Sequence, residues 1–230
     1  MAESLPDPEP RALAILGGTF DPIHYGHLEL AREVRTALGL AEVRIIPAGD
    51  PPHRAAPHAP ARDRFAMAVL GVQPYAGLMA DDREVHRAGP SYTVVTLQEL
   101  RAEQPSRPLA VIVGADAFLG FETWHRWREI FALAHVVLVA RPGIDLASGL
   151  TGDLAAEWQA RRTTDRGTLE MHAAGSIYQQ SITPHAISAS AIRAALARGD
   201  TAVVRGLLPD AVLAYIGRNH LYSEPSPDAI

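Results

Sequence analysis

The chain has 230 residues, of which 47% are hydrophobic and 20% are charged, and its formal net charge is −5. The length suits one α/β domain, and the composition excludes a wholly disordered chain. The negative charge argues against a general surface for nucleic acid, and the apolar runs are too short to span a membrane.

Two residue types are missing from the sequence. There is no cysteine and no lysine, because all 21 residues counted as lysine or arginine are arginines. Their absence excludes disulfides, thiolate nucleophiles and cysteine-ligated metals, and also a Walker-type lysine or a lysyl-AMP intermediate. Phosphate chemistry in this protein must therefore use arginine, histidine, backbone amides and metal.

The first half of the chain alternates strand and helix patterns. Residues 1–10 are acidic and rich in proline, which predicts a disordered tail on a cytoplasmic protein rather than a signal peptide. The apolar run 11–16 ends at two glycines, as a buried first strand does. The next predicted elements are a helix over 28–38, a strand over 43–47, a loop over 48–60 and helices over 61–70 and 91–103.

The second half continues the alternation with strands over 109–113 and 136–140 and a helix over 129–133. The polar segment 143–175 predicts an insertion with one short helix near 154–160. A strand over 176–183, helices over 188–198 and 210–218 and a tail over 221–230 follow. This order predicts a Rossmann-like, doubly wound parallel α/β sheet in a single domain, 11–220, with a C-terminal helical portion.

The run 17–27 reads G-G-T-F-D-P-I-H-Y-G-H and joins the first strand to the first helix. Open α/β sheets bind ligands there, because glycines let a phosphate approach the backbone and a helix N-terminus offers unpaired N–H groups. His24 and His27 can both donate N–H to a phosphoryl oxygen. The alternatives are a glycine turn with incidental surface histidines, or a metal pair without a third ligand at suitable spacing. The whole string in this position favours the phosphate site.

A second run, 187–193, reads I-S-A-S-A-I-R. It predicts a helix capped by Ser188 with Arg193 one turn further on, which is a second place for an anion. Alone, such a run is more often a serine cap beside an exposed arginine. Together with the first run, it favours phosphate binding.

The two runs resemble motifs of the HxGH nucleotidylyltransferase superfamily and, more closely, of bacterial nicotinate-nucleotide adenylyltransferases. The resemblance spans 14–198 as spaced motifs, with 143–175 outside it. It implies adenylyl transfer from ATP to nicotinate mononucleotide, giving deamido-NAD and pyrophosphate. It also implies that His24, His27 and Arg193 are the catalytic residues. The implied ATP and phosphate contacts are Gly17, Gly18, Thr19, Phe20, Ser188, Ser190 and Arg141.

Three further runs resemble the mononucleotide side of the family: P-P-H-R at 51–54, G-P-S-Y-T at 89–93, and G-A-D at 114–116 followed by Trp124. Trp124 would stack on the pyridine ring; a core aromatic is the alternative. We expect N–H and hydroxyl donors around the nicotinate carboxylate and no acidic side chain. The implied mononucleotide contacts are His53, Arg54, Thr93, Gly114, Asp116, Trp124 and His125.

The sequence departs from the family pattern at four positions. Arg54 replaces lysine, Ala189 replaces serine, Ser190 replaces threonine, and Val95 stands where the family commonly has aspartate. Backbone amides can still serve at Ala189, so at most a weaker phosphate contact is expected there.

The implied nucleophile is a phosphate oxygen that is already ionised at neutral pH, so no general base and no covalent intermediate are needed. Mg²⁺ bound through the ATP phosphates is the implied cofactor, without a dedicated metal site in the protein. The rivals are another HxGH enzyme, such as phosphopantetheine adenylyltransferase, and a catalytically silent nucleotide-binding sensor. Neither nucleic acid nor a membrane is an expected partner, and a homo-oligomer is left open.

Overall fold

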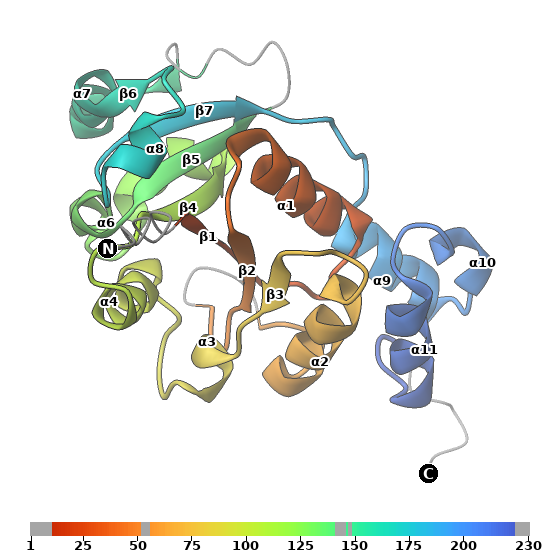
Figure 1. The fold of residues 1–230 in the computed structure, drawn as a ribbon. Coiled ribbons are helices and arrows are strands. Elements are labelled where there is room, and N and C mark those ends of the chain that lie inside the picture. The colour runs from red at the N-terminus through yellow and green to blue at the C-terminus, as the bar shows by residue number, and fades with distance from the viewer. Residues whose placement is uncertain (1–10, 52–55, 141–145, 147–148, 224–230) are drawn as a thin grey trace, which may run out of the picture.

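The computed structural model describes residues 11–51, 56–140, 146 and 149–223 (Figure 1). Its strands are β1 (Leu13–Gly18), β2 (Glu42–Pro47), β3 (Leu78–Ala80), β4 (Leu109–Gly114), β5 (His135–Ala140), β6 (Arg162–Thr163) and β7 (Ile177–Ser181). Its longer helices are α1 (Tyr25–Leu38), α2 (Ala61–Val72), α4 (Thr93–Glu103), α6 (Trp127–Leu133), α7 (Gly152–Arg161), α9 (Ala189–Ala197) and α11 (Asp210–Arg218). The shorter ones are α3 (Arg83–His86), α5 (Ala115–Leu119), η1 (Phe121–Thr123), α8 (Thr168–Met171) and α10 (Thr201–Val204).

The described strands form one parallel sheet in the order β3-β2-β1-β4-β5-β7-β6. The chain moves outward from β1 to β3 and then returns to the other side of β1 with β4. Strand order therefore reverses between β1 and β4, which is where open α/β sheets bind ligands. The predicted doubly wound parallel sheet is confirmed.

The two central strands separate before they end. β1 and β4 pair only from Leu13↔Leu109 to Ile15↔Val111, although each strand runs three residues further. β1 stays paired with β2 as far as Gly18↔Pro47. The carboxyl end of β1 therefore has a partner on one side only, and a crevice opens between β1 and β4.

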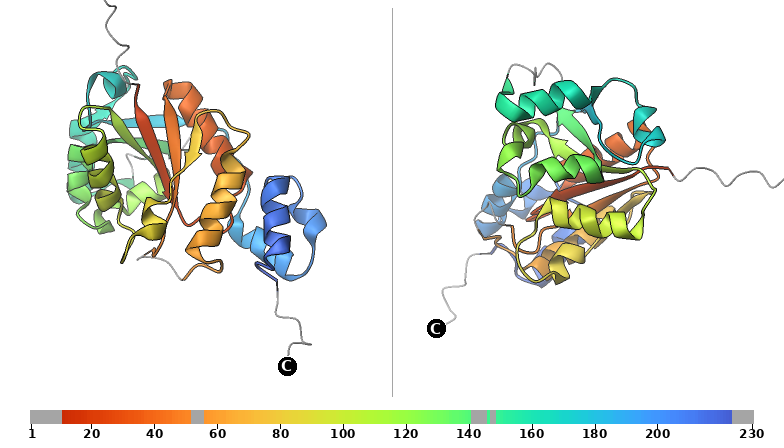
Figure 2. Two further views of the ribbon diagram at one scale, coloured as in Figure 1. Left: turned by 60° about the horizontal axis from the view of Figure 1, so that its bottom comes forward. Right: turned by 90° about the vertical axis from the view of Figure 1, so that its left-hand side faces the viewer.

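Alternation along the strands builds a core on each face of the sheet. Ala14, Ile112 and Val137 point into a core with α1, α2, α9 and α11. Ile15 and Val111, their strand neighbours, point into the opposite core with α4, α6 and α7. Figure 2, left, shows the sheet between these two helical layers.

The C-terminal helices lie together at one side of the sheet, where α11 packs against α2 (Figures 1 and 2). This agrees with the predicted C-terminal helical portion. Within the part of the chain that the structure describes, no helix combines the length and apolar character needed to cross a bilayer.

Several boundaries differ from the sequence predictions. α1 begins at Tyr25 rather than at residue 28, which puts both histidines of the run 17–27 at its first turn. Strands β3 and β6 and helix α3 were not predicted, because two to four residues carry too little pattern. The short helix predicted within 143–175 is present as α7, and its Leu154 and Trp158 are buried in the core.

Candidate active site

The histidine pair lies at the start of α1. His24 is the N-cap residue, and the ring of His27 stacks on it with centroids 3.7 Å apart and an interplanar angle of 21°. Nδ1 of His27 accepts a hydrogen bond from the backbone N–H of His24 at 3.4 Å. His24 is 4% exposed, and its own buried Nδ1 lacks a hydrogen-bond partner among the described residues. A ligand oxygen at this helix end would find polar ring nitrogens close together.

Burial determines the charge of His24. Desolvation lowers the pKa of His24 to about 4, so the ring is neutral at neutral pH. A neutral imidazole has one N–H donor. His24 can therefore donate a hydrogen bond to a phosphoryl oxygen, but it does not supply a positive charge in the free protein.

Two glycines of the run 17–27 make room for aromatic rings. A Cβ on Gly18 would lie 2.9 Å from the ring of Phe20, which packs edge-on against His27 at 5.0 Å between centroids. A Cβ on Gly26 would lie 3.0 Å from the His24 ring and 3.6 Å from Cβ of Ile187. Gly26 therefore leaves room for the His24 ring, while Ile187 of the second run lies at ordinary van der Waals distance from this position.

The second run forms the start of α9 as predicted. Ser188 is the N-cap residue, and its hydroxyl accepts from the backbone N–H of Ala191 at 3.5 Å. Arg193 lies one turn further on and donates to the hydroxyl of Ser190 at 3.3 Å. Ala189 is the first residue of the helix, where backbone amides lack an intrahelical acceptor whatever the side chain. The arrangement offers N–H donors and one cation.

Asp21 connects the two runs to the rest of the site. Its carboxylate is 4% exposed and accepts from the backbone N–H of His58 at 2.8 Å, that of Ala59 at 3.1 Å, and the hydroxyl of Tyr222 at 2.7 Å. Arg193 donates to the backbone carbonyl of Asp21 at 2.6 Å. Burial alone would raise the pKa of Asp21, but these hydrogen bonds and the Arg193 charge hold it below its ordinary value. Asp21 is therefore ionised and positions Arg193.

A buried arginine holds the loops around the strand ends. Arg64 of α2 is 1% exposed and donates to the backbone carbonyls of Thr19 at 2.7 Å, Ala59 at 3.1 Å and Gly49 at 3.2 Å. One guanidinium thereby fixes the segments that follow β1 and β2. The sequence did not reveal this residue, because an arginine in an amphipathic helix is ordinarily exposed.

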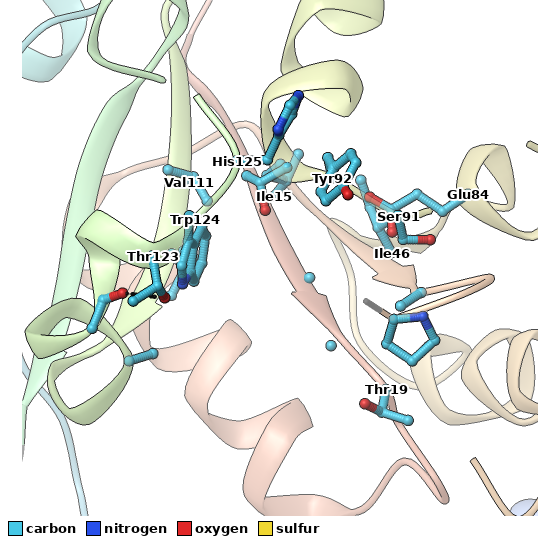
Figure 3. A pocket seen from close by; sticks show the side chains of 18 of the residues that line it. Ile15, Thr19, Ile46, Glu84, Ser91, Tyr92, Val111, Thr123, Trp124 and His125 are labelled. Atoms are coloured by element: carbon cyan, nitrogen blue, oxygen red, sulfur yellow. Dashed lines mark hydrogen bonds between the residues drawn. The ribbon is translucent and has the colours of Figure 1, made fainter. Parts of the chain in front are cut away.

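A cavity of about 370 Å³ occupies the crevice between β1 and β4 (Figure 3). Ile15 and Val111 are part of its apolar lining. Trp124 stands on one side, and Tyr92 and Ser91 stand on the other. The Trp124 ring packs on Phe121 at 4.8 Å, and the Tyr92 ring stacks on His125 at 4.3 Å.

The structure brings many of the predicted contacts into this cavity. Those that line it are Gly17, Gly18, Thr19, Thr93, Asp116, Trp124 and His125. Gly114 is the N-cap residue of α5 at the end of β4. A second group of predicted contacts lies at the starts of α1 and α9: His24, His27, Ser188, Ser190 and Arg193. Phe20 packs against the ring of His27. His53, Arg54 and Arg141 lie outside the described residues.

The helix predicted from residue 91 begins at Thr93, with Tyr92 as its N-cap residue. The hydroxyl of Ser91 accepts instead from the backbone N–H groups of Gly49 and Asp50. The cavity lining includes an acidic side chain outside the predicted contacts, Glu84 of α3. That no acidic side chain lies beside the nicotinate carboxylate stays a prediction. Val95 packs against the apolar core, where an aspartate would need a polar partner.

Comparison with known proteins agrees with this geometry. A family model described as cytidylyltransferase-like matches residues 15–195. A probable nicotinate-nucleotide adenylyltransferase of Acidithiobacillus ferrooxidans is 47% identical over 213 residues, which cover 93% of this chain and 96% of the relative. This chain belongs to the nicotinate-nucleotide adenylyltransferase family. A relative of the same name from Dechloromonas aromatica is 49% identical over 212 residues, covering 91% of this chain and 97% of that one.

Solved structures share the fold of this family member. The Plasmodium falciparum nicotinic acid mononucleotide adenylyltransferase complexed with NaAD superimposes with a TM-score of 0.68, covering 92% of this chain and 97% of that chain. The identity between the two chains is 15%, so this likeness concerns the fold alone.

Proposed function

We propose that this protein transfers an adenylyl group from ATP to nicotinate mononucleotide, forming deamido-NAD and pyrophosphate. A phosphate oxygen of the mononucleotide attacks the α-phosphorus of ATP, and the bond from that phosphorus to the oxygen bridging to the β-phosphate breaks. The attacking oxygen is ionised at neutral pH, so the protein needs to align the groups and stabilise charge rather than remove a proton.

One observation carries the proposal: the run 17–27 both lines the cavity and forms the start of α1, where a phosphate can bind. Gly17, Gly18 and Thr19 line the cavity that contains Trp124, and His24 follows them at the start of α1. A pyridine ring against Trp124 would thus have its phosphate near the end of β1. The names of the relatives described above support this substrate pair.

We assign the triphosphate to the starts of α1 and α9. His24 and His27 would donate N–H to the oxygens that gain charge in the transition state. Arg193 and the first amides of α9 would hold the departing pyrophosphate, since Asp21 already fixes the Arg193 guanidinium. Arg141 remains a further candidate for the ATP side.

We assign the mononucleotide to the cavity. Trp124 offers a stacking face, Thr93 a hydroxyl and helix-start amides, and Asp116 a partner for a ribose hydroxyl. His125, stacked on Tyr92, borders the same space. His53 and Arg54 remain candidates for the mononucleotide phosphate.

We propose that Mg²⁺ accompanies ATP and is bound chiefly by phosphate oxygens and water, as is usual for this ion. The carboxylate of Asp21 is already occupied by three hydrogen bonds, and the described residues include no group of three metal-ligating side chains. Bound in this way, the ion would neutralise charge on the phosphates.

A panel of acceptors, comprising mononucleotides and phosphopantetheine, is incubated with ATP and Mg²⁺, and the pyrophosphate released tests the proposal. Nicotinate mononucleotide should give the largest kcat/KM. Release of pyrophosphate with phosphopantetheine instead would indicate the rival enzyme. Nucleotide binding without release from any acceptor would indicate a sensor.

A further inference from the structure

A buried acidic side chain stands at the wall of the cavity without a role in the chemistry above. Glu84 is 7% exposed and accepts a hydrogen bond from the hydroxyl of Thr96 on α4 at 2.5 Å. Hydrogen bonding by the neighbouring hydroxyl of Ser91 contributes to lowering the pKa of this carboxyl. Figure 3 shows Glu84 and Ser91 side by side. A carboxyl group buried to this degree needs such partners to offset its desolvation.

The hydroxyl of Ser91 has its other positions filled. Its oxygen accepts from the backbone N–H of Gly49 at 2.9 Å and of Asp50 at 3.2 Å, so its single proton is left to donate to Glu84. The backbone N–H of Ser91 donates to the carbonyl of Asp50 at 2.8 Å. The hydroxyl beside Glu84 therefore holds the loop after β2.

The loop also packs directly on the backbone of α3. A Cβ on Gly49 would lie 2.1 Å from the carbonyl oxygen of Glu84, a distance that no side chain could occupy. Gly49 is therefore needed for this close approach. The same short segment is held by its backbone contact with Glu84 and by the hydroxyl of Ser91.

We propose that Glu84 is a positioning residue for the mononucleotide: acting through Ser91, it fixes the loop after β2 against the start of α4. The inference rests on the function proposed above, because both segments line the cavity, the loop with Pro51 and the helix start with Tyr92 and Thr93. The starts of α1 and α9, assigned to ATP, contain none of these contacts.

Protonation of Glu84 should change the KM for the mononucleotide. Burial raises the pKa of Glu84, while the hydrogen bonds from Thr96 and Ser91 and the nearby charge of Arg87 lower it and Glu99 raises it. Arg87 lies 4.0 Å from the carboxylate and pairs with Glu99 at 2.7 Å. Protonation of Glu84 turns one carboxylate oxygen from an acceptor into a donor, so the hydroxyl of either Thr96 or Ser91 loses its acceptor. The KM for the mononucleotide should therefore rise as the pH falls through the pKa of Glu84.

The test compares Glu84→Gln with Ser91→Ala, which removes the intermediary hydroxyl, and with Glu103→Gln as a control on an exposed residue of α4. At pH 7.5, Glu84→Gln and Ser91→Ala should each raise the KM for nicotinate mononucleotide about fivefold, the value of one hydrogen bond. The KM for ATP should stay within about twofold of the control. The double variant should be less than additively worse, since both changes break one chain of contacts.

The pH dependence is measured as the KM of Glu84→Gln divided by the KM of wild type. Ionisation of the substrate affects both enzymes equally, so it cancels in this ratio. This ratio should approach one as the pH falls. A constant ratio, an equal rise in the KM for ATP, or additive effects in the double variant would each overturn the proposal.

Hydrogen exchange at the Gly49 and Asp50 amides gives a second readout that needs no substrate. Faster exchange in both Glu84→Gln and Ser91→Ala supports the positioning role, and unchanged exchange overturns it. If the wild type releases no pyrophosphate with nicotinate mononucleotide, the proposed function fails, whereas this exchange experiment still judges the role of Glu84.

Discussion

The hydroxyl of Tyr222 tests how the C-terminal segment supports the run 17–27. It donates at 2.7 Å to Asp21, whose carboxylate is 4% exposed. Tyr222→Phe removes this single oxygen. A hydrogen bond to a charged group contributes about 1.5–3 kcal/mol, and a chain of this size loses about 2–4 °C of Tm per kcal/mol. We therefore expect the Tm at pH 7 to fall by about 3–12 °C.

The fall in Tm caused by Tyr222→Phe should become smaller at low pH. Burial would raise the pKa of Asp21, but the bonds from Tyr222, His58 and Ala59 and the Arg193 charge hold it below its ordinary value. A carboxyl with a depressed folded-state pKa stabilises the fold above its unfolded pKa of about 3.9, and this stabilisation is lost as the pH falls through the folded value. Tyr222→Phe removes one cause of the depression, so the difference in Tm between this variant and wild type should stay constant above about pH 4 and narrow only below it.

Thermal unfolding followed by circular dichroism at pH 7, 4.5 and 2.5 makes this measurement, because the lowest pH lies below the unfolded pKa of about 3.9. Tyr215→Phe is the matched control, since its hydroxyl donates to the carboxylate of Asp63 at 2.8 Å. Asp63 does not accept the two backbone N–H bonds that Asp21 accepts from His58 and Ala59, so the loss should lie at the lower end of about 1.5–3 kcal/mol. Equal losses in the two variants, or a Tyr222→Phe loss that does not change with pH, would show that the buried Asp21 charge is not the source of the stabilisation.

Four further predictions concern the assigned roles. His27→Ala should keep its circular dichroism spectrum and lose about 100-fold or more in kcat, and the double variant with His24→Ala should be less than additively worse; near-normal turnover would contradict the assignment. Arg193→Gln should raise the KM for ATP and spare that for the mononucleotide; the reverse pattern would put Arg193 on the other substrate. Trp124→Ala should raise the KM for the mononucleotide and spare that for ATP. Wild type should prefer nicotinate to nicotinamide mononucleotide in kcat/KM by at least about tenfold, or about 1.4 kcal/mol; equal efficiency would refute this preference.

Features that repeat along the chain could be predicted from the sequence. The apolar strands, the two glycines at the end of β1 and the serine at the start of α9 each leave a local pattern, and the structure has all of them. The doubly wound sheet followed from their alternation. The motif strings in turn indicated the family to which the chain belongs.

Features that depend on distant partners could not be predicted. Arg64 and Tyr222 contact the run 17–27 from 45 and 201 residues away in the chain, and neither lies in a recognisable motif. Glu84 belongs to a four-residue helix, and its burial follows from the packing of α3 on the loop after β2. The sequence predicts a helix from residue 91, but α4 begins at Thr93 and the hydroxyl of Ser91 contacts that loop instead.

The short segment 17–21, from the end of β1 to Asp21, connects the two halves of the site. Gly17 and Gly18 line the cavity, Thr19 is held by Arg64, and Asp21 holds Arg193. If the mononucleotide and ATP bind as proposed, the distance between the attacking oxygen and the α-phosphorus depends on this one stretch of backbone. Alignment of reacting groups contributes to rate rather than to the affinity for either substrate alone. Substitutions that loosen the segment, such as Arg64→Met, should therefore reduce kcat more than they raise either KM.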